Sequence, residues 1–316
     1  MSYKDRRAMI LEQREAKEDL DMISAINMFL FSRKVKNLSE GTFSFYKQTL
    51  NDFSNFLSSL EVLKPSEVIL EDIQEYIRGR SEKGNSVPTI NKYIRSLRAF
   101  FNYLCSSGYL RENPMEAVDK LVEEKRVLRT LSRDQVRTLL NIPNQGTPAG
   151  YRNYVFMLLL LDTGVRLEEA LSVRLPDIFW EERVIQVFGK GRRERIVPFS
   201  EMLAAYLYEY IGIRGDLGHD VLFVNVEGQP LKRRTIQEDI SNYAAKAGID
   251  GVRVSSHSLR YTFARNYLLN GGDVVSLMKI MGHKSLAMAQ LYAEMFQPDI
   301  ARQHAKYSPA MSIFAK

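Results

Sequence analysis

The sequence contains little of several residue types, and each shortage excludes a class of protein. One cysteine among 316 residues, Cys105, excludes a disulfide framework and any metal site built from cysteine pairs. Four histidines leave little material for a histidine-rich metal cluster. The longest strongly apolar run, residues 155–161, is far shorter than the roughly 20 residues of a membrane-spanning helix. Residues 1–20 are too charged for a signal peptide, so we expect a soluble protein of a reducing, cytoplasmic compartment.

The composition is otherwise that of a folded protein with a modest excess of positive charge. Charged residues make up 26% of the chain and apolar residues 45%, which is ordinary for a globular protein. Lysine and arginine number 44 against 38 acidic residues, and the formal net charge is +6. The length indicates about two domains. The charge excess favours a polyanionic partner such as nucleic acid, although it identifies none by itself.

Apolar residues in the first third of the chain recur at the spacing of helices. This spacing predicts helices over residues 42–60, 65–80 and 87–104. Pro88 falls in the first turn of the third helix, where its missing N–H costs nothing. We interpret residues 21–115 as a small helical bundle that follows a charged leader, residues 1–20.

A linker and a second, mostly helical domain follow the bundle. Asn113–Pro114 ends the bundle, because a residue before proline is disfavoured in helical conformation. Residues 116–130 are rich in charge and form the predicted linker. Ser132 and Gln135 have the spacing of a capping box, in which each side chain accepts a hydrogen bond from the other residue's backbone N–H. The second domain is predicted to span residues 131–300, with a tail at 301–316.

A β-hairpin interrupts the helical pattern of the second domain. Helical spacing covers residues 150–172 and returns from residue 234 onward. Between these stretches, residues 183–188 and 193–199 alternate β-branched and polar side chains around the turn GKGR at 189–192. The run VLFV at 221–224 is a candidate third strand. The predicted fold class is therefore mainly α with a small antiparallel β-sheet.

Four short segments of the second domain combine reactive side chains with tight local structure. They are TGVRLEEA at 163–170, GKGRRER at 189–195, SSHSLRYTFA at 255–264 and MGHKSLAMAQLYAEM at 281–295. In the third, His257 and Arg260 are three residues apart and share one face of a helix. Each segment alone has an ordinary interpretation as a solvated charge, a solubilising loop or a core aromatic.

Together, the four segments resemble the tyrosine recombinase family, the phage integrase-like enzymes. The matching residues are two arginines, a lysine, two histidines and a tyrosine, in the order Arg166, Lys190, His257, Arg260, His283 and Tyr292. Met281 stands where leucine is commoner in the family. The resemblance covers nearly the whole chain. It implies that residues 21–115 are a SAM-like, core-binding DNA-binding domain and that residues 131–300 are the catalytic domain.

The resemblance also implies a role for each of the six residues in the cleavage and rejoining of duplex DNA. Arg166 and Arg260 would bind the non-bridging oxygens of the scissile phosphate, which suits a planar guanidinium that stays charged. Tyr292 would be the nucleophile, giving a 3′-phosphotyrosine and a free 5′-hydroxyl. His257 would accept or relay its proton, Lys190 would protonate the leaving oxygen and His283 would donate a hydrogen bond to the phosphate. Glu169 would orient Arg166.

The implied partners follow from the same resemblance. The substrate is a double-stranded recombination site in nucleoid DNA, bound by a dimer of the chain and paired in a tetramer, with accessory DNA-bending proteins as further candidates. No cofactor is expected, because the covalent bond conserves the energy for rejoining, so neither ATP nor a metal ion is needed. The tail would dock on a neighbouring protomer or pack on its own. The cations expected near phosphates are Arg192, Arg193, Lys232, Arg233 and Arg234.

Several biological roles share this chemistry. The short leader indicates that a separate arm-site-binding domain is absent, which favours a simple two-domain enzyme. We favour integration, excision or resolution for a mobile genetic element over Xer-like resolution of chromosome or plasmid dimers. A type IB topoisomerase-like relaxation activity and a DNA-binding regulator without catalysis are further alternatives. A general nuclease is disfavoured, because no cluster of metal-ligating residues is evident.

A phosphate-dominated interface predicts that affinity for DNA falls steeply with salt. Each phosphate contact by lysine or arginine releases condensed counterions, so the logarithm of the binding constant should fall linearly with the logarithm of salt concentration. Fluorescence anisotropy of a labelled duplex between 50 and 200 mM salt, about the range in which such binding weakens most measurably, gives the slope. A flat response would contradict the assignment.

Overall fold

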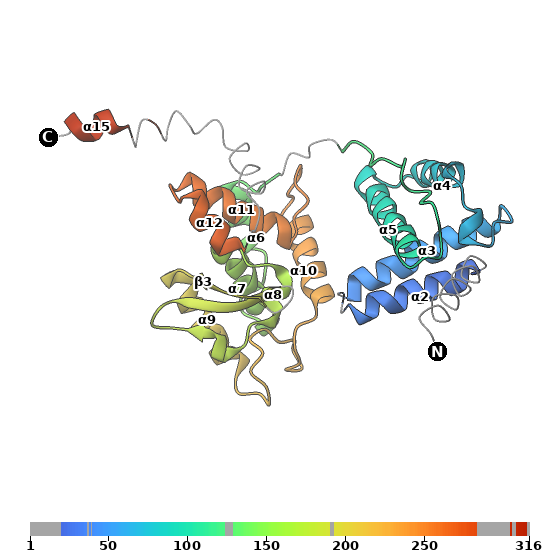
Figure 1. Ribbon diagram of the computed structural model, residues 1–316. Coiled ribbons are helices and arrows are strands. Elements are labelled where there is room, and N and C mark those ends of the chain that lie inside the picture. Colours follow the sequence, from blue (N-terminus) through green and yellow to red (C-terminus); the bar gives the residue numbers. More distant parts are fainter. Residues whose placement is uncertain are drawn as a thin grey trace, which may run out of the picture. The chain divides into compact units, whose positions relative to one another are not determined.

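Helices dominate the computed structural model, and the chain divides into two compact units, Met1–Lys125 and Arg126–Lys316. The structure describes residues 20–36, 38, 40–123, 129–189, 193–282, 304 and 308–314. One three-stranded antiparallel sheet accompanies the helices of the second unit (Figure 1). The predicted fold class, mainly α with a small antiparallel sheet, is confirmed. No helix in the described ranges is long and apolar enough to span a bilayer.

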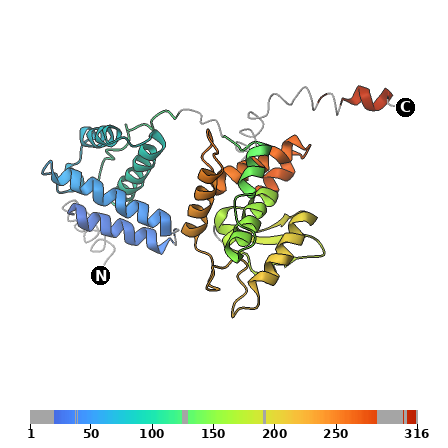
Figure 2. The same ribbon diagram turned by 180° about the vertical axis from the view of Figure 1, so that it is seen from behind.

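The described part of the first unit is a bundle of four helices around an aromatic core. Its elements are α2 (Met22–Val35), α3 (Glu40–Ser58), the 3₁₀ turn η1 (Pro65–Glu67), α4 (Leu70–Glu82) and α5 (Val87–Ser106). Helix α5 crosses α2 and α3, and Figure 2 shows the same bundle from behind. Phe29, Phe53 and Phe100 are fully buried, and their rings meet neighbouring aromatic rings edge to face. The three predicted helices form, although η1 replaces the first turn of the second.

Helix α2 was not predicted from the spacing of apolar residues, and its surface explains why. Phe29 and Leu30 are buried on one side, while Ile23, Phe31 and Val35 are exposed on the other. Apolar side chains therefore surround the helix, and the one-sided period that marks an amphipathic helix is absent.

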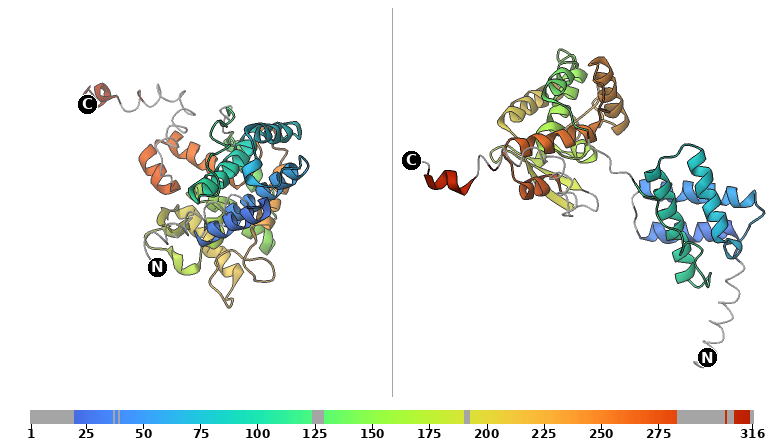
Figure 3. Two further views of the ribbon diagram at one scale, coloured as in Figure 1. Left: turned by 45° about the vertical axis from the view of Figure 1, so that its right-hand side comes forward. Right: turned by 90° about the horizontal axis from the view of Figure 1, so that it is seen from above.

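The second unit surrounds a helix that is buried on nearly all sides. This helix, α7 (Pro148–Thr163), packs against α9 and α11 and contacts the shorter helices beside them. Figure 3 shows the unit from two further directions. The other helical elements in the described part of this unit are α6 (Arg133–Leu140), α8 (Leu167–Ser172), η2 (Leu175–Asp177), α9 (Glu201–Arg214), α10 (Arg233–Lys246), α11 (Ser256–Leu269), α12 (Val274–Met281) and α15 (Pro309–Phe314). The predicted capping box forms, with Gln135 N 3.2 Å from Ser132 Oγ and Ser132 N 2.9 Å from Gln135 Oε1.

The sheet contains the predicted hairpin but not the predicted third strand. Strands β2 (Val184–Gly189) and β3 (Arg193–Pro198) pair antiparallel, and β1 (Ile178–Phe179) adds to β2. The prediction of a third strand at residues 221–224 was wrong. Val221 and Val224 form only isolated bridges, to Arg174 and Pro230. Leu222 and Phe223 are buried, so this apolar run fills the core as a connecting segment, which its composition alone does not distinguish from a strand.

The helical pattern over residues 150–172 corresponds to two helices, α7 and α8, because Gly164 ends α7. Its φ of +61° lies in the left-handed region, and its N–H donates to the Leu160 carbonyl as a helix C-cap. A Cβ on Gly164 would lie 2.2 Å from a ring carbon of Phe263 on α11. Backbone conformation and the close approach of α11 therefore both require glycine here.

Replacement of Gly164 by alanine should destabilise the second unit by about 2–4 kcal/mol. The estimate adds the cost of a left-handed non-glycine residue to that of overpacking against Phe263. Thermal unfolding of the full chain, followed by circular dichroism, measures the loss.

The matched control is Gly212→Ala on α9. A Cβ on Gly212 would have no heavy atom within 4 Å, and the residue has no left-handed φ. Alanine should therefore leave the melting temperature unchanged or raise it, because glycine within a helix is unfavourable. A Gly164→Ala protein that melts with the wild type would contradict the analysis.

Candidate active site

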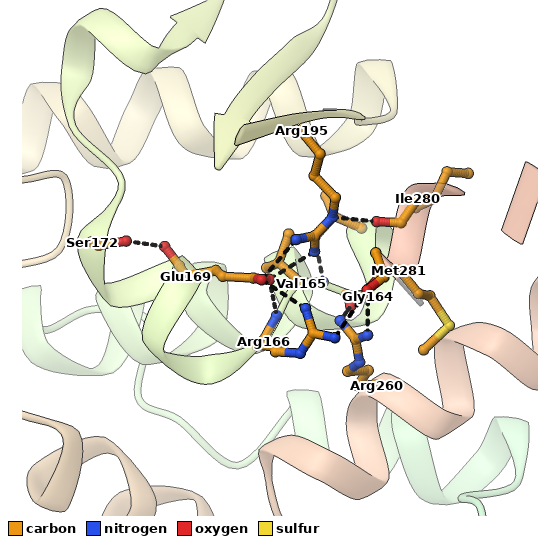
Figure 4. Close-up of polar contacts among 11 residues, drawn as sticks. Gly164, Val165, Arg166, Glu169, Ser172, Arg195, Arg260, Ile280 and Met281 are labelled. Carbon is orange, nitrogen blue, oxygen red and sulfur yellow. Dashed lines mark hydrogen bonds and ion pairs between the residues drawn. The ribbon is translucent and has the colours of Figure 1, made fainter. Parts of the chain in front are cut away.

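Three arginines from three different elements converge on one glutamate and on the end of one helix (Figure 4). Arg166 is the N-cap of α8, Arg195 lies in β3 and Arg260 lies in α11. Glu169 is in the first turn of α8, and the helix end is that of α12. The fold therefore brings together residues, such as Arg166 and Arg260, that are more than 90 positions apart in the sequence.

Glu169 is the buried anion of this cluster. The residue is 2% exposed, and each of its two carboxylate oxygens accepts two hydrogen bonds. Burial alone would raise the pKa of the carboxyl, but the hydrogen bonds and charges of Arg195 and Arg166 outweigh burial and lower it to about 2. The carboxylate is therefore ionised at any neutral pH. Its contribution to stability is lost only as the pH falls toward that value.

Arg166 is held in place while part of its side chain faces solvent. Its backbone N–H donates to Glu169 Oε2 at 2.8 Å, and its Nη1 donates to Oε1 at 2.9 Å. Its Nη2 donates to the Gly282 carbonyl at 3.2 Å. The side chain is nevertheless 42% exposed. A guanidinium that is oriented in this way and still accessible can bind an external anion such as a phosphate oxygen.

Arg260 is almost fully buried, and main-chain carbonyls are its acceptors. The residue is 4% exposed. Its Nη1 donates to the Gly164 carbonyl, and its Nη2 donates to the Met281 carbonyl at 2.6 Å. These contacts connect the ends of α7 and α12, which lie more than 100 residues apart in the chain.

The last carbonyls of α12 each accept a hydrogen bond from a different arginine. Ile280 accepts from Arg195, Met281 from Arg260 and Gly282 from Arg166. The final carbonyls of a helix have no partner within the helix, and they form the negative end of its dipole. They are therefore favourable acceptors for guanidinium groups. Gly282, with a φ of +63°, supplies the left-handed C-cap that turns these carbonyls outward.

His257 lies beside the cluster as the second residue of α11. Desolvation is the main cause of a lowered pKa, and the positive charges of Arg260, Arg233 and Arg166 lower it further. The positive end of the α11 dipole acts in the same direction. The lowered pKa favours the neutral imidazole, which is the form that accepts a proton.

Three cations occupy the N-terminus of α10. Lys232 is its N-cap, and Arg233 and Arg234 are its first two residues. Arg233 forms an ion pair of 3.0 Å with Glu168 of α8, which places this helix end next to the arginine cluster. Arg234 pairs with Glu238 at 2.6 Å. All three residues are exposed.

The structure describes the side chains of seven predicted site residues: Lys232, Arg233 and Arg234 at the start of α10, and four others that lie together. Those four are Arg166, Glu169, His257 and Arg260. Lys190, Arg192, His283 and Tyr292 lie outside the described residues, and of Arg193 only the backbone is described, as the first residue of β3. The catalytic and DNA-binding roles of all these residues stay predictions. Among the described residues no cluster of His, Cys, Asp and Glu could hold a metal ion.

Arg195 belongs to the cluster and was not predicted from the sequence. It pairs with Val187 in the register of the hairpin, and both neighbours on its face, Ile185 and Val197, are buried. An arginine at an inward-facing strand position must find a partner, because a buried charge is costly when unpaired. That alternation was the available signal, but the cationic sequence around Arg195 obscured it.

Two family models match the chain. The one described as "Phage integrase family" matches residues 129–297, and "Phage integrase, N-terminal SAM-like domain" matches residues 27–108. Tyrosine recombinase XerC of Bacillus subtilis (strain 168) is 29% identical over 281 residues, which are 87% of this chain and 92% of that protein.

Solved structures share the fold. The Tn1549 transposon integrase in complex with transposon right end DNA has a TM-score of 0.73 at 21% identity, covering 91% of this chain and 99% of that one. A lambda integrase tetramer bound to a Holliday junction has a TM-score of 0.72 at 16% identity, covering 87% of this chain and 81% of that one. Because the first family model alone spans more than half of the sequence, the chain belongs to the phage integrase family of tyrosine recombinases, which are DNA strand-transferase enzymes.

Proposed function

We propose that this protein carries out site-specific recombination of duplex DNA through a 3′-phosphotyrosine intermediate. The observation that carries the proposal is the convergence of Arg166 and Arg260 on the end of α12, with Arg166 also bound to buried Glu169, and with His257 beside them. The chain that follows the α12 carbonyls contains His283 and Tyr292. A site with these groups supplies positive charge, a proton acceptor and a nucleophile for attack on a phosphodiester.

The arginines would act on the charge of the reacting phosphate. A phosphodiester is a poor electrophile, because its anionic oxygens repel a nucleophile. Arg166 and Arg260 would bind the two non-bridging oxygens and stabilise the additional charge of the pentacoordinate transition state. Their hydrogen bonds to main-chain carbonyls and to Glu169 orient the guanidiniums before substrate binds, so little reorganisation remains to be done during the reaction.

The remaining groups would move protons. The phenolic oxygen of Tyr292 forms a bond to phosphorus, its proton passes to His257, and the bond from phosphorus to the 5′ oxygen breaks. Lys190 protonates that leaving oxygen, while His283 donates a hydrogen bond to the phosphate. Attack of another 5′-hydroxyl on the phosphotyrosine reverses the step, so one bond forms for each bond broken and no external energy source is required.

DNA would be bound by both units, as a dimer on each site and a tetramer during strand exchange. The cations at the start of α10 support this proposal for the second unit. Lys232, Arg233 and Arg234 lie at the positive end of a helix, where cations are unfavourable and phosphate is favourable. A phosphate of the bound duplex would compete with Glu168 for Arg233. This substrate places the proposed activity in the cytoplasm, on nucleoid DNA.

One relative bears on the two biological roles considered from the sequence. A relative that matches nearly along its whole length is named XerC. This name supports the Xer-like alternative, while integration, excision or resolution for a mobile genetic element stays our prediction. The likeness to a transposon integrase concerns the fold alone and does not favour either role. Relaxation of supercoils without strand exchange between two sites would instead indicate the topoisomerase-like alternative.

The variant Tyr292→Phe should bind DNA with unchanged affinity and form no covalent adduct, because phenylalanine lacks the attacking oxygen. The substrate is a duplex enriched from random genomic fragments by its binding to this variant. We call it the selected duplex. A version nicked near the cleavage position traps the wild-type adduct, which migrates as a shifted band in a denaturing gel.

Two outcomes would contradict the proposal. An adduct of normal yield with Tyr292→Phe would remove Tyr292 as the nucleophile. Specific binding by the wild type without any adduct would favour the non-catalytic DNA-binding regulator.

The lowered pKa of His257 predicts a pH profile for adduct formation. The imidazole must be neutral to accept the phenolic proton, so the rate should rise with pH through a pKa below the ordinary value of 6.5 and level off above that pKa. Single-turnover rates on the selected duplex between pH 5 and about 8, the range in which histidine titrates, measure this limb. The limb should disappear in His257→Gln, and its persistence there would assign it to another group.

A further inference from the structure

We propose that Arg195 is a positioning residue of the strand-transfer reaction: it binds Glu169 and the end of α12 at the same time, and so fixes Arg166 relative to the chain that continues to His283. This inference rests on the proposed function. Arg195 binds Glu169 and the Ile280 carbonyl, so it would act through the groups that these contacts hold in place.

The contacts of Arg195 use all three nitrogens of its guanidinium. Nη1 donates to Glu169 Oε1 and Nη2 donates to Glu169 Oε2, both at 2.7 Å. Nε donates to the Ile280 carbonyl at 2.8 Å. The side chain is 14% exposed, so water competes little for these bonds. One rigid, planar group therefore connects β3, α8 and α12, as Figure 4 shows.

The position of Arg166 depends on this connection, because the two arginines share the same carboxylate. Glu169 Oε1 accepts from Nη1 of both arginines, and Oε2 accepts from Arg166 N and Arg195 Nη2. Without Arg195, half of the hydrogen bonds to a buried carboxylate would be lost. The charged groups of the described residues that bind this carboxylate are Arg166 from α8 and Arg195 from β3, while Arg260 from α11 lies nearby and binds carbonyls. Removal of Arg195 would leave each carboxylate oxygen with one donor, both from Arg166, and would remove the contacts that hold this pair against β3 and α12.

Arg195 also connects the two chain segments that lead to Lys190 and His283, the predicted general acid and phosphate ligand. Lys190 precedes Arg195 by five residues in the sequence, between the last residue of β2 and the first of β3. His283 follows Ile280 by three residues. A shift of β3 against α12 would therefore change the spacing between the chain segments that carry the proposed general acid and the proposed phosphate ligand. An error of about 1 Å in such a site can lower a rate by about 100-fold.

Lysine cannot replace arginine in this arrangement. Its ammonium group could reach one carboxylate oxygen but could not bind both oxygens and the Ile280 carbonyl together, because it lacks the planar fork of donors. Glutamine would remove the charge as well. The two substitutions therefore weaken the contact with Glu169 to different degrees. Arg195→Lys keeps the positive charge and part of the contact, whereas Arg195→Gln keeps no charge.

The experiment separates binding from chemistry. Equilibrium binding of full-length Arg195→Lys and Arg195→Gln to the selected duplex is measured beside the single-turnover rate of adduct formation at saturating protein. Binding should stay within about twofold of wild type. The adduct rate should fall by roughly 100-fold in Arg195→Gln, with Arg195→Lys between that variant and the wild type.

Arg214→Lys is the matched control for loss of a buried arginine. Arg214, in α9, is also buried in the second unit and binds the carbonyls of Val221, Gly215 and His219. Its substitution should lower the melting temperature without lowering the adduct rate of bound, folded protein. If Arg195→Gln does not fold, the adduct rates of Arg195→Lys and Arg214→Lys are compared instead. Each variant is then assayed at the same number of degrees below its own melting temperature.

The outcomes distinguish this inference from the proposed function. Adduct formation by the wild type through Tyr292 tests the function, and the ratio of variant to wild-type rate tests Arg195. A wild-type adduct rate in both Arg195 variants would overturn the inference. So would a loss of rate no larger than that of Arg214→Lys, or a loss explained entirely by weaker binding, because Arg195 would then be a residue of the fold only.

Discussion

The ion pairs of one buried carboxylate determine the geometry of the site. Three guanidiniums gathered within a few ångströms would repel one another, and the repulsion is strongest where water is excluded. Glu169 offsets part of this charge, with a pKa of about 2 that keeps it ionised. Since it supplies one negative charge for three positive ones, the cluster keeps a net positive charge. That excess is what an anionic phosphate would neutralise on binding.

Main-chain carbonyls also hold the arginines in place, and unlike Glu169 they add no negative charge. Helices α7 and α12 both end in a left-handed glycine, and carbonyls at both ends accept from Arg260. A carbonyl orients a guanidinium but does not neutralise it. The helix ends therefore fix the direction of the arginines while leaving their charge available. The same hydrogen bonds hold the helices of the second unit together, so the geometry of the site and the stability of the fold depend on shared contacts.

Local patterns predicted much of this structure, and long-range contacts account for the errors. The helices of the first unit, the capping box at Ser132 and the hairpin follow from spacing and turn chemistry over a few residues. The break at Gly164 depends on Phe263, about 100 residues away, and the burial of Leu222 and Phe223 depends on the surrounding helices. The alternation of β3 points Arg195 inward but does not identify its partners. Its partner Ile280 is 85 residues distant, so no local pattern contains the contact.

The N-terminus of α10 carries positive charge, unlike the N-termini of several other helices in the second unit. Several other helices here begin with a serine, threonine or aspartate cap, which complements the positive end of the helix dipole. Helix α10 begins with Lys232, Arg233 and Arg234 instead, which repel that end. Glu168 compensates one of these charges through its pair with Arg233. Because a phosphate would be stabilised both by the exposed backbone N–H groups and by the cations, the arrangement that is unfavourable for an isolated helix becomes favourable once a polyanion is bound.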